Sequence, residues 1–198
     1  MGESSVRADI AILGDEFIGV EVKGQRDTLR RLPTQLRAYT RHFDRTIVVA
    51  ANRHLKHLLR DDLCGAALWS FDIEGKLTEM KPGSAPSHVE AERYLEMMTQ
   101  GERRRSLGAR SKLLGGVGAE QGPPVTSSAA RAAFFEVFKE RYGKISADFW
   151  QHTARRAVKP DDLRLLSRFL ELRNEAQRIA AEKDNFWRTW AEQSEAQN

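Results

Sequence analysis

Two stretches near the start of the chain alternate apolar and polar residues with a period of two, the pattern of strands in an antiparallel sheet. They cover residues 7–13 and 17–23, and the three residues between them, Gly14 to Glu16, fit a short hairpin loop. Three more runs rich in β-branched, aromatic or alternating residues lie at 45–51, 66–72 and 76–80. The first eighty residues are therefore predicted to contain five strands.

Between these strands the apolar residues recur at three- and four-residue steps, as on one face of a helix. The first such segment carries Leu29, Leu32, Leu36, Tyr39 and Phe43. Because Pro33 has no amide hydrogen, we expect the helix either to kink there or to begin there. A second helix is expected over 52–60. Strands alternating with helices predict an α/β fold over residues 7–82.

The second half of the chain has a different pattern. A Pro- and Gly-rich break at 82–86 precedes a predicted helix at 88–98. Residues 101–128 hold six glycines, a Pro-Pro pair and an Arg-Arg-Arg run with little apolar periodicity, which predicts a flexible linker. Helical spacing then continues to the end. We expect an α/β domain at 1–100, the linker at 101–128 and a helical C-terminal region at 129–198.

Composition narrows the class of protein. Hydrophobic residues make up 40% of the 198 residues and charged residues 30%, as in globular proteins. No apolar run approaches the roughly 20 residues that cross a bilayer, and the first residues do not resemble a secretion signal. The single cysteine, Cys64, excludes an internal disulfide and a cysteine-based zinc site. We therefore expect a cytoplasmic location.

The hairpin gathers charge at one end. With the predicted loop, facing residues have numbers that sum to 30, so Asp9 faces Glu21 and Arg7 faces Lys23, while the opposite face is wholly apolar. Two carboxylates directly opposite each other destabilise a sheet unless a cation lies between them. A hard ion such as Mg²⁺ or Mn²⁺, bound with the backbone carbonyl of Val22, would relieve the repulsion. Ordinary ion pairs with Arg7 and Lys23 are the alternative interpretation.

These residues resemble the D…(D/E)xK signature of the PD-(D/E)XK nuclease superfamily. Asp9 is followed by Glu21-Val22-Lys23 at the end of the next strand. The downstream residues resemble a small bacterial branch of that superfamily at these positions: Asp27, Thr28, Leu29, Arg31, Leu32, Gln35, Tyr39, Phe43 and Asp44. The resemblance covers residues 6–80 and does not extend to the helical half.

The resemblance implies a restriction-endonuclease-like core with a mixed sheet, and metal-dependent hydrolysis of nucleic acid with DNA as the expected substrate. Asp9 and Glu21 would bind the metal, and Lys23 would orient the attacking water or stabilise charge on the phosphate. Gln35 matches a glutamine that RecB-like and resolvase-like nucleases carry on the following helix; a surface amide is the alternative interpretation. Members of the superfamily usually have a helix before the Asp strand that contributes a Glu.

Only eight residues precede Asp9, and Glu3 is their sole acid. We therefore expect that acid to come from sequence beyond this segment or from another subunit, or else the site to be incomplete. An incomplete site would make the chain a non-catalytic nucleic-acid-binding or assembly subunit that keeps the nuclease fold.

A basic stretch follows Lys23. Residues 24–60 contain nine Lys or Arg against two acids, although the net charge of the whole chain is only +4. At 100° per residue, four arginines fall within about 60° of one another, apart from the apolar face; they are Arg26, Arg30, Arg37 and Arg41. This stripe is predicted to contact the phosphate backbone, with a solvated helix face as the alternative. The C-terminal helices, with Trp150, Trp187 and Trp190, suggest a homodimer seam or a docking site for a partner protein.

Overall fold

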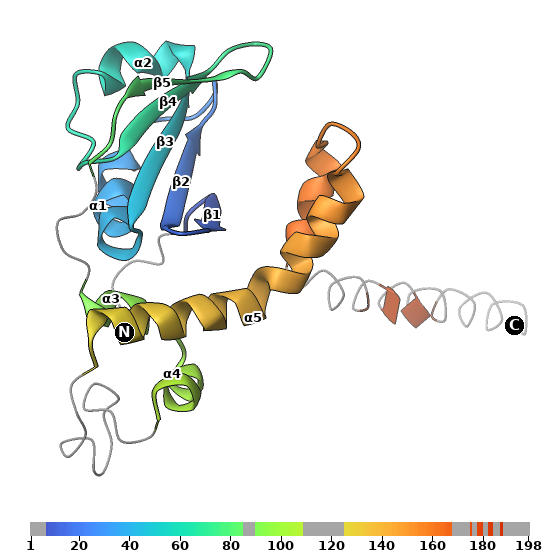
Figure 1. Cartoon of the computed structure of the whole chain (residues 1–198). Helices are drawn as coiled ribbons and strands as arrows, with labels where there is room; N and C mark the ends of the chain where they lie inside the picture. The colour runs from blue at the N-terminus through green and yellow to red at the C-terminus, as the bar shows by residue number, and fades with distance from the viewer. Residues whose placement is uncertain are drawn as a thin grey trace, which may run out of the picture. The chain divides into compact units, whose positions relative to one another are not determined.

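The computed structural model describes residues 7–84, 90–108 and 125–167, together with residues 175, 178, 179, 182, 183 and 187. Its elements, drawn in Figure 1, are β1 (Ile10–Leu13), β2 (Phe17–Lys23), α1 (Leu32–His42), β3 (Arg45–Ala51), α2 (Asn52–Leu58), β4 (Ala67–Phe71), β5 (Leu77–Lys81), α3 (Ala91–Glu96), α4 (Gln100–Leu107), α5 (Ser127–Thr153) and a 3-10 helix (Pro160–Leu166). The chain divides into two compact units, residues 1–137 and 138–198, and the division falls inside α5.

The first unit is built on a mixed five-stranded sheet in the order β1-β2-β3-β4-β5. The outer pairs β1–β2 and β4–β5 are antiparallel, and β3 runs parallel to both of its neighbours. The predicted α/β fold with a mixed sheet and a helical C-terminal segment is therefore confirmed. Leu13 pairs with Phe17 and Ile10 with Val20, so the predicted hairpin register is confirmed over these residues.

Strand β1 is shorter than the sequence pattern predicted. Pairing ends at Ile10, and Arg7 and Asp9 do not continue the ladder opposite Lys23 and Glu21. The side chain of Asp9 accepts the amide hydrogen of Val22 instead. A carboxylate oxygen thus takes the hydrogen bond that a backbone carbonyl of a longer β1 would have accepted.

Helix α1 begins at Leu32, with Pro33 in its first turn, so the prediction of a helix start at Pro33 is confirmed. A proline fits there because the first-turn amides have no partner within the helix. Helices α1 and α2 pack on the same face of the sheet. The buried core of this layer consists of Leu32, Leu36, Val48, Ala50, Leu58, Leu63, Ala66 and Leu68.

The opposite face of the sheet carries a smaller cluster of Val20, Ile47 and Ala67. Toward the β1 edge its apolar side chains are open, and Ile10 and Ile12 are 49% and 47% exposed. The charged residues of β2 lie on the helix-covered face, where Glu21 is 2% and Lys23 5% exposed. Helix packing therefore buries the polar face of the hairpin and leaves the apolar face accessible.

The predicted linker is wrong at its N-terminal end. Residues 100–107 form helix α4, which begins with a capping box between Thr99 and Glu102 and includes the Arg-Arg-Arg run. The Thr99 hydroxyl accepts the Glu102 amide and the Glu102 carboxylate accepts the Thr99 amide. The stability gained from these two hydrogen bonds outweighs the low helix propensity of the nearby glycines. Residues 109–124 lie outside the described part of the chain, and α5 begins at Ser127.

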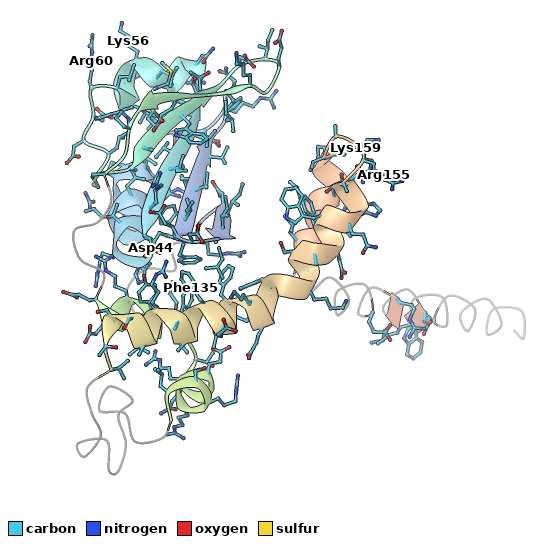
Figure 2. The ribbon with its side chains drawn as sticks, in the orientation of Figure 1. Asp44, Lys56, Arg60, Phe135, Arg155 and Lys159 are labelled. Carbon is cyan, nitrogen blue, oxygen red and sulfur yellow. The ribbon has the colours of Figure 1, made fainter. Side chains whose placement is uncertain are left out.

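The predicted domain boundaries also need correction, because the first part of α5 belongs to the α/β unit. Phe134 packs edge-on against Phe17 of β2, with ring centroids 4.9 Å apart, and lies 5.7 Å from the ring of Tyr94. Asp44 joins these elements: it accepts hydrogen bonds from the Phe17 amide at 2.8 Å and the Tyr94 hydroxyl at 2.6 Å. Arg131 of α5 reaches the same carboxylate at 3.4 Å and stacks on Phe135. Asp44 and Phe135 are labelled in Figure 2.

The second unit contains the rest of α5 and the 3-10 helix. Arg156 forms two hydrogen bonds of 2.7 Å with the carboxylate of Asp162. These bonds, with a further one from the Lys159 amide, hold the pKa of Asp162 well below its usual range. Among the described helices, none combines the length and apolarity needed to span a membrane.

Candidate functional site

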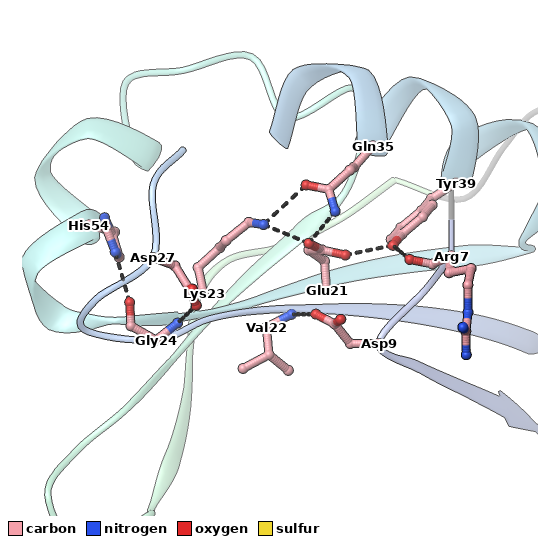
Figure 3. A network of polar contacts seen from close by, with 10 residues as sticks. All are labelled: Arg7, Asp9, Glu21, Val22, Lys23, Gly24, Asp27, Gln35, Tyr39 and His54. Atoms are coloured by element: carbon pink, nitrogen blue, oxygen red, sulfur yellow. Dashed lines mark hydrogen bonds and ion pairs between the residues drawn. The ribbon is translucent and has the colours of Figure 1, made fainter. Parts of the chain in front are cut away.

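The candidate site forms where β2 ends beneath helix α1 (Figure 3). Glu21 and Lys23 are two residues apart on β2 and so point to the same side of the sheet, and Lys23 Nζ donates to Glu21 Oε1 at 2.6 Å. From α1, Gln35 Nε2 donates to the same oxygen at 2.5 Å, and Gln35 Oε1 accepts from Lys23 Nζ at 3.0 Å. The three side chains close a triangle in which Glu21 and Lys23 are buried and Gln35 is half-buried.

Tyr39 holds the other oxygen of Glu21. Its hydroxyl lies 2.5 Å from Glu21 Oε2 and 2.6 Å from the backbone carbonyl of Arg7. Burial, followed by the hydrogen bond to Glu21 and the negative charges of Glu21 and Asp9, raises the pKa of Tyr39 far above its usual range. The hydroxyl therefore keeps its proton and acts as a donor throughout the neutral pH range.

Asp9 completes the group from the chain leading into β1. Its Oδ2 accepts the Val22 amide at 2.9 Å, which holds its carboxylate beside the strand between Glu21 and Lys23. Oδ1 accepts no hydrogen bond from the described residues. Unlike Glu21, Asp9 is exposed, so the site has one solvent-facing and one buried carboxylate.

The turn after Lys23 is also fixed. The Gly24 amide donates to Asp27 Oδ2 at 2.7 Å, and the Gly24 carbonyl lies 3.0 Å from Nε2 of His54 on α2. His54 is 4% exposed, and in neutral imidazole this contact requires the hydrogen to reside on Nε2. The buried histidine thus holds the backbone that leaves the site, a role the sequence analysis did not predict.

The donor set can be compared with what a divalent ion requires. A carboxylate offers about four acceptor directions, and the contacts to Glu21 use two on Oε1 and one on Oε2. One direction on Oε2, Oδ1 of Asp9 and the Val22 carbonyl are oxygen donors of the kind that Mg²⁺ or Mn²⁺ binds. Within residues 7–84, 90–108 and 125–167, no group of three acid, His or Cys side chains could hold a metal. An ion here would take its other ligands from water and phosphate.

The four predicted phosphate-binding arginines do not form one helical stripe. Because α1 begins at Leu32, Arg26 and Arg30 lie in the preceding turn, whereas Arg37 and Arg41 lie on the helix. The predicted stripe requires one helix that includes Arg26 and Arg30 and continues through Pro33, and α1 is too short for this. All four side chains are exposed, so the predicted basic surface is composed of a turn and a helix.

The structure therefore brings together Asp9, Glu21, Lys23 and Gln35, as the sequence predicted. Tyr39 belongs to the family pattern and to the apolar face of the helix, but neither pattern assigned it to the site. The signal was its spacing, since Gln35 and Tyr39 are four residues apart and share one face of α1. Glu3 lies outside the described residues.

Comparison with known proteins gives one family match. A family model described as bacteriophage P4 protein cII matches residues 1–167. This match spans the whole α/β unit and the 3-10 helix. No curated protein and no solved structure matches the chain.

Proposed function

The chain belongs to the bacteriophage P4 protein cII family, and we propose that it is a metal-dependent nuclease with a PD-(D/E)XK core. It would hydrolyse phosphodiester bonds of nucleic acid, with DNA as the expected substrate. The observation that carries the proposal is the hydrogen-bonded triangle of buried Glu21 and Lys23 with half-buried Gln35, beside the exposed carboxylate of Asp9. A structural ion pair needs no second carboxylate at its rim, whereas phosphodiester hydrolysis needs anionic metal ligands and a cation together.

Each side chain has a separate role in this proposal. Asp9 and Glu21, with the Val22 carbonyl, would hold Mg²⁺ or Mn²⁺. The bound ion would supply polarisation of the phosphoryl oxygens and an activated water. Lys23 has three donor hydrogens, and its hydrogen bonds to Glu21 and Gln35 use two of them. The third can donate to the phosphate or to the attacking water, while Gln35 fixes the direction of the ammonium.

The basic surface supports nucleic acid as the substrate. Arg26 and Arg30 are exposed in the turn that follows the Lys23 strand, and Arg37 and Arg41 are exposed on the helix that carries Gln35. Cationic side chains on the elements that form the site would position a phosphate backbone next to it.

The second candidate function is a non-catalytic nucleic-acid-binding subunit that keeps the same fold. It is favoured by the hydrogen bonds from Lys23, Gln35 and Tyr39 to Glu21, which satisfy much of that carboxylate without a metal. Both candidates predict binding of nucleic acid. They differ in whether a divalent ion binds and supports cleavage.

Metal dependence tests the proposal directly. Wild-type protein should cleave single- or double-stranded DNA in Mn²⁺ or Mg²⁺ and lose cleavage in EDTA, because the ion supplies the activated water. Adding Mn²⁺ back should restore the rate, and calorimetry should detect Mn²⁺ binding without DNA. Cleavage that is unchanged by EDTA would contradict the proposal. DNA binding with neither Mn²⁺ binding nor cleavage would favour the non-catalytic candidate.

The basic surface is tested by the double substitution Arg37→Ala with Arg41→Ala. Each lost phosphate contact removes about 0.9 from the slope of log K against log salt on duplex DNA, so the slope should flatten by about 2. The matched control is Lys56→Ala with Arg60→Ala, an exposed pair with the same spacing and charge at α2 (Figure 2). The control should keep the wild-type slope. If both double variants flattened the salt slope equally, the net charge of the chain and not the position of the arginines would determine DNA binding.

A further inference from the structure

The Tyr39 hydroxyl contacts both halves of the candidate site. Tyr39 is 2% exposed and comes from α1, yet its oxygen lies 2.5 Å from Glu21 Oε2 on β2 and 2.6 Å from the carbonyl of Arg7. Arg7 precedes Asp9 by two residues. In Figure 3, Tyr39 lies at the Arg7 end of the site, whereas Lys23 and Gln35 approach Glu21 from the other side.

We propose that Tyr39 is a positioning residue for the metal ligands of this site, an inference that rests on the proposed nuclease function. Its single hydroxyl hydrogen is shared between two acceptors: it sets the direction of Glu21 Oε2 and, through the Arg7 carbonyl, holds the chain that presents Asp9. Ligands of a metal ion are commonly oriented by hydrogen bonds of this kind from residues that do not touch the ion.

The need for such a residue follows from where β1 begins. Ladder pairing starts at Ile10, so strand hydrogen bonds do not hold the residues that carry Asp9. In the described chain, Asp9 is held to β2 through the Val22 amide, and Arg7 is held to α1 through Tyr39. Without the contact between Tyr39 and Arg7, the Asp9 segment would be held to β2 only through the Asp9 carboxylate among these contacts, and that carboxylate is the proposed metal ligand.

Glu21 also needs a donor on its second oxygen to fix the orientation of its carboxylate. Lys23 and Gln35 both donate to Oε1, and among the described residues Tyr39 is the donor to Oε2. A glutamate side chain with one oxygen held can still rotate about that contact. The Tyr39 hydroxyl removes this freedom and leaves one acceptor direction of Oε2 available to an ion.

The hydroxyl can be separated experimentally from the ring. The Tyr39 ring packs edge-on against Phe43 with centroids 5.7 Å apart, and phenylalanine can preserve this contact. Tyr94 provides a matched control in the same unit. It is 1% exposed, and its hydroxyl donates to the carboxylate of Asp44 at 2.6 Å, outside the group formed by Asp9, Glu21, Lys23 and Gln35.

The test compares wild type, Tyr39→Phe and Tyr94→Phe as full chains. Calorimetry should show that Tyr39→Phe binds Mn²⁺ about 10- to 100-fold more weakly, the usual effect of losing a hydrogen-bond partner of a metal ligand. Tyr94→Phe should bind Mn²⁺ like wild type. Thermal unfolding in EDTA should show a loss of stability in both variants, since each loses a hydroxyl donor to a carboxylate, and a somewhat larger loss in Tyr39→Phe, which also loses the Arg7 contact.

The possible outcomes separate this inference from the proposed function. The positioning role would be overturned if Tyr39→Phe bound Mn²⁺ as tightly as wild type, or if both variants lost affinity equally. The nuclease proposal would still stand in that case if the wild-type chain cleaved DNA in Mn²⁺. Absence of Mn²⁺ binding by the wild-type chain would overturn both. A loss confined to Tyr39→Phe supports the positioning role, because the two variants differ in which carboxylate loses its donor.

Discussion

Asp9→Asn is expected to reduce Mn²⁺-dependent cleavage about a thousandfold, which corresponds to about 4 kcal/mol of lost transition-state stabilisation. Asparagine keeps an oxygen that can accept the hydrogen bond from the Val22 amide, so this contact with the backbone should survive. What disappears is the negative charge of the exposed carboxylate. Single-turnover cleavage and Mn²⁺ calorimetry on the same preparation measure the two consequences, and Mn²⁺ affinity should fall together with the rate.

The control for Asp9→Asn is Asp15→Asn at the loop end of the same hairpin. Asp15 is also exposed, and its side chain lies four residues or more from each predicted ligand in sequence, so cleavage should stay at the wild-type level. Equal residual activity in wild type and Asp9→Asn would assign the cleavage to a contaminating nuclease. That result would remove the role given to Asp9.

Lys23→Met is expected to reduce cleavage about 100- to 1000-fold while Mn²⁺ binding is retained. The reason is that the ammonium stabilises transition-state charge but is not a metal ligand. Its removal also leaves the buried Glu21 carboxylate without a cation, which should lower the free energy of unfolding in EDTA by about 3 kcal/mol. Because Mn²⁺ binding is retained, added Mn²⁺ should stabilise the variant and wild type by about the same free energy. Stopped-flow cleavage, calorimetry and thermal unfolding measure these effects.

Lys81→Met is the matched control for Lys23→Met. Lys81 is also a strand lysine, but its ammonium donates to the backbone carbonyl of Asp61 at 3.2 Å rather than to a carboxylate. This control should change neither cleavage nor the response to Mn²⁺. Lys23→Gln, which keeps a donor toward Glu21 without the charge, serves if the methionine variant does not fold. Full cleavage by Lys23→Gln would contradict the catalytic role of the ammonium.

Local patterns predicted much of the α/β unit. The period-two alternation identified the hairpin, and its three-residue loop fixed the register that places Leu13 opposite Phe17. Pro33 marked the start of α1, since a proline is tolerated where helical amides have no partner. These features depend on interactions between residues close in sequence. The prediction failed where a local signal was overlooked, as with the capping box of Thr99 and Glu102 that starts α4.

The sequence pattern also indicates which residues carry the candidate chemistry. It identified Asp9, Glu21, Lys23 and Gln35 from their spacing and from a resemblance to a nuclease superfamily. The division of α5 between two units could not be predicted in this way. It depends on Phe134 meeting Phe17 and Tyr94, which lie far away in the chain.

Which face of the hairpin is buried depends on how the helices pack on the sheet. Alternation shows that the two faces differ, but β3 and β4 are apolar on both faces, so the strand pattern does not indicate where α1 and α2 will pack. The helices cover the side of Glu21 and Lys23 and leave Ile10 and Ile12 accessible. The same packing brings the Tyr39 hydroxyl to Glu21 and Arg7, 18 and 32 residues away in the chain. Contacts over such separations depend on how the elements pack together, which no short window of sequence contains.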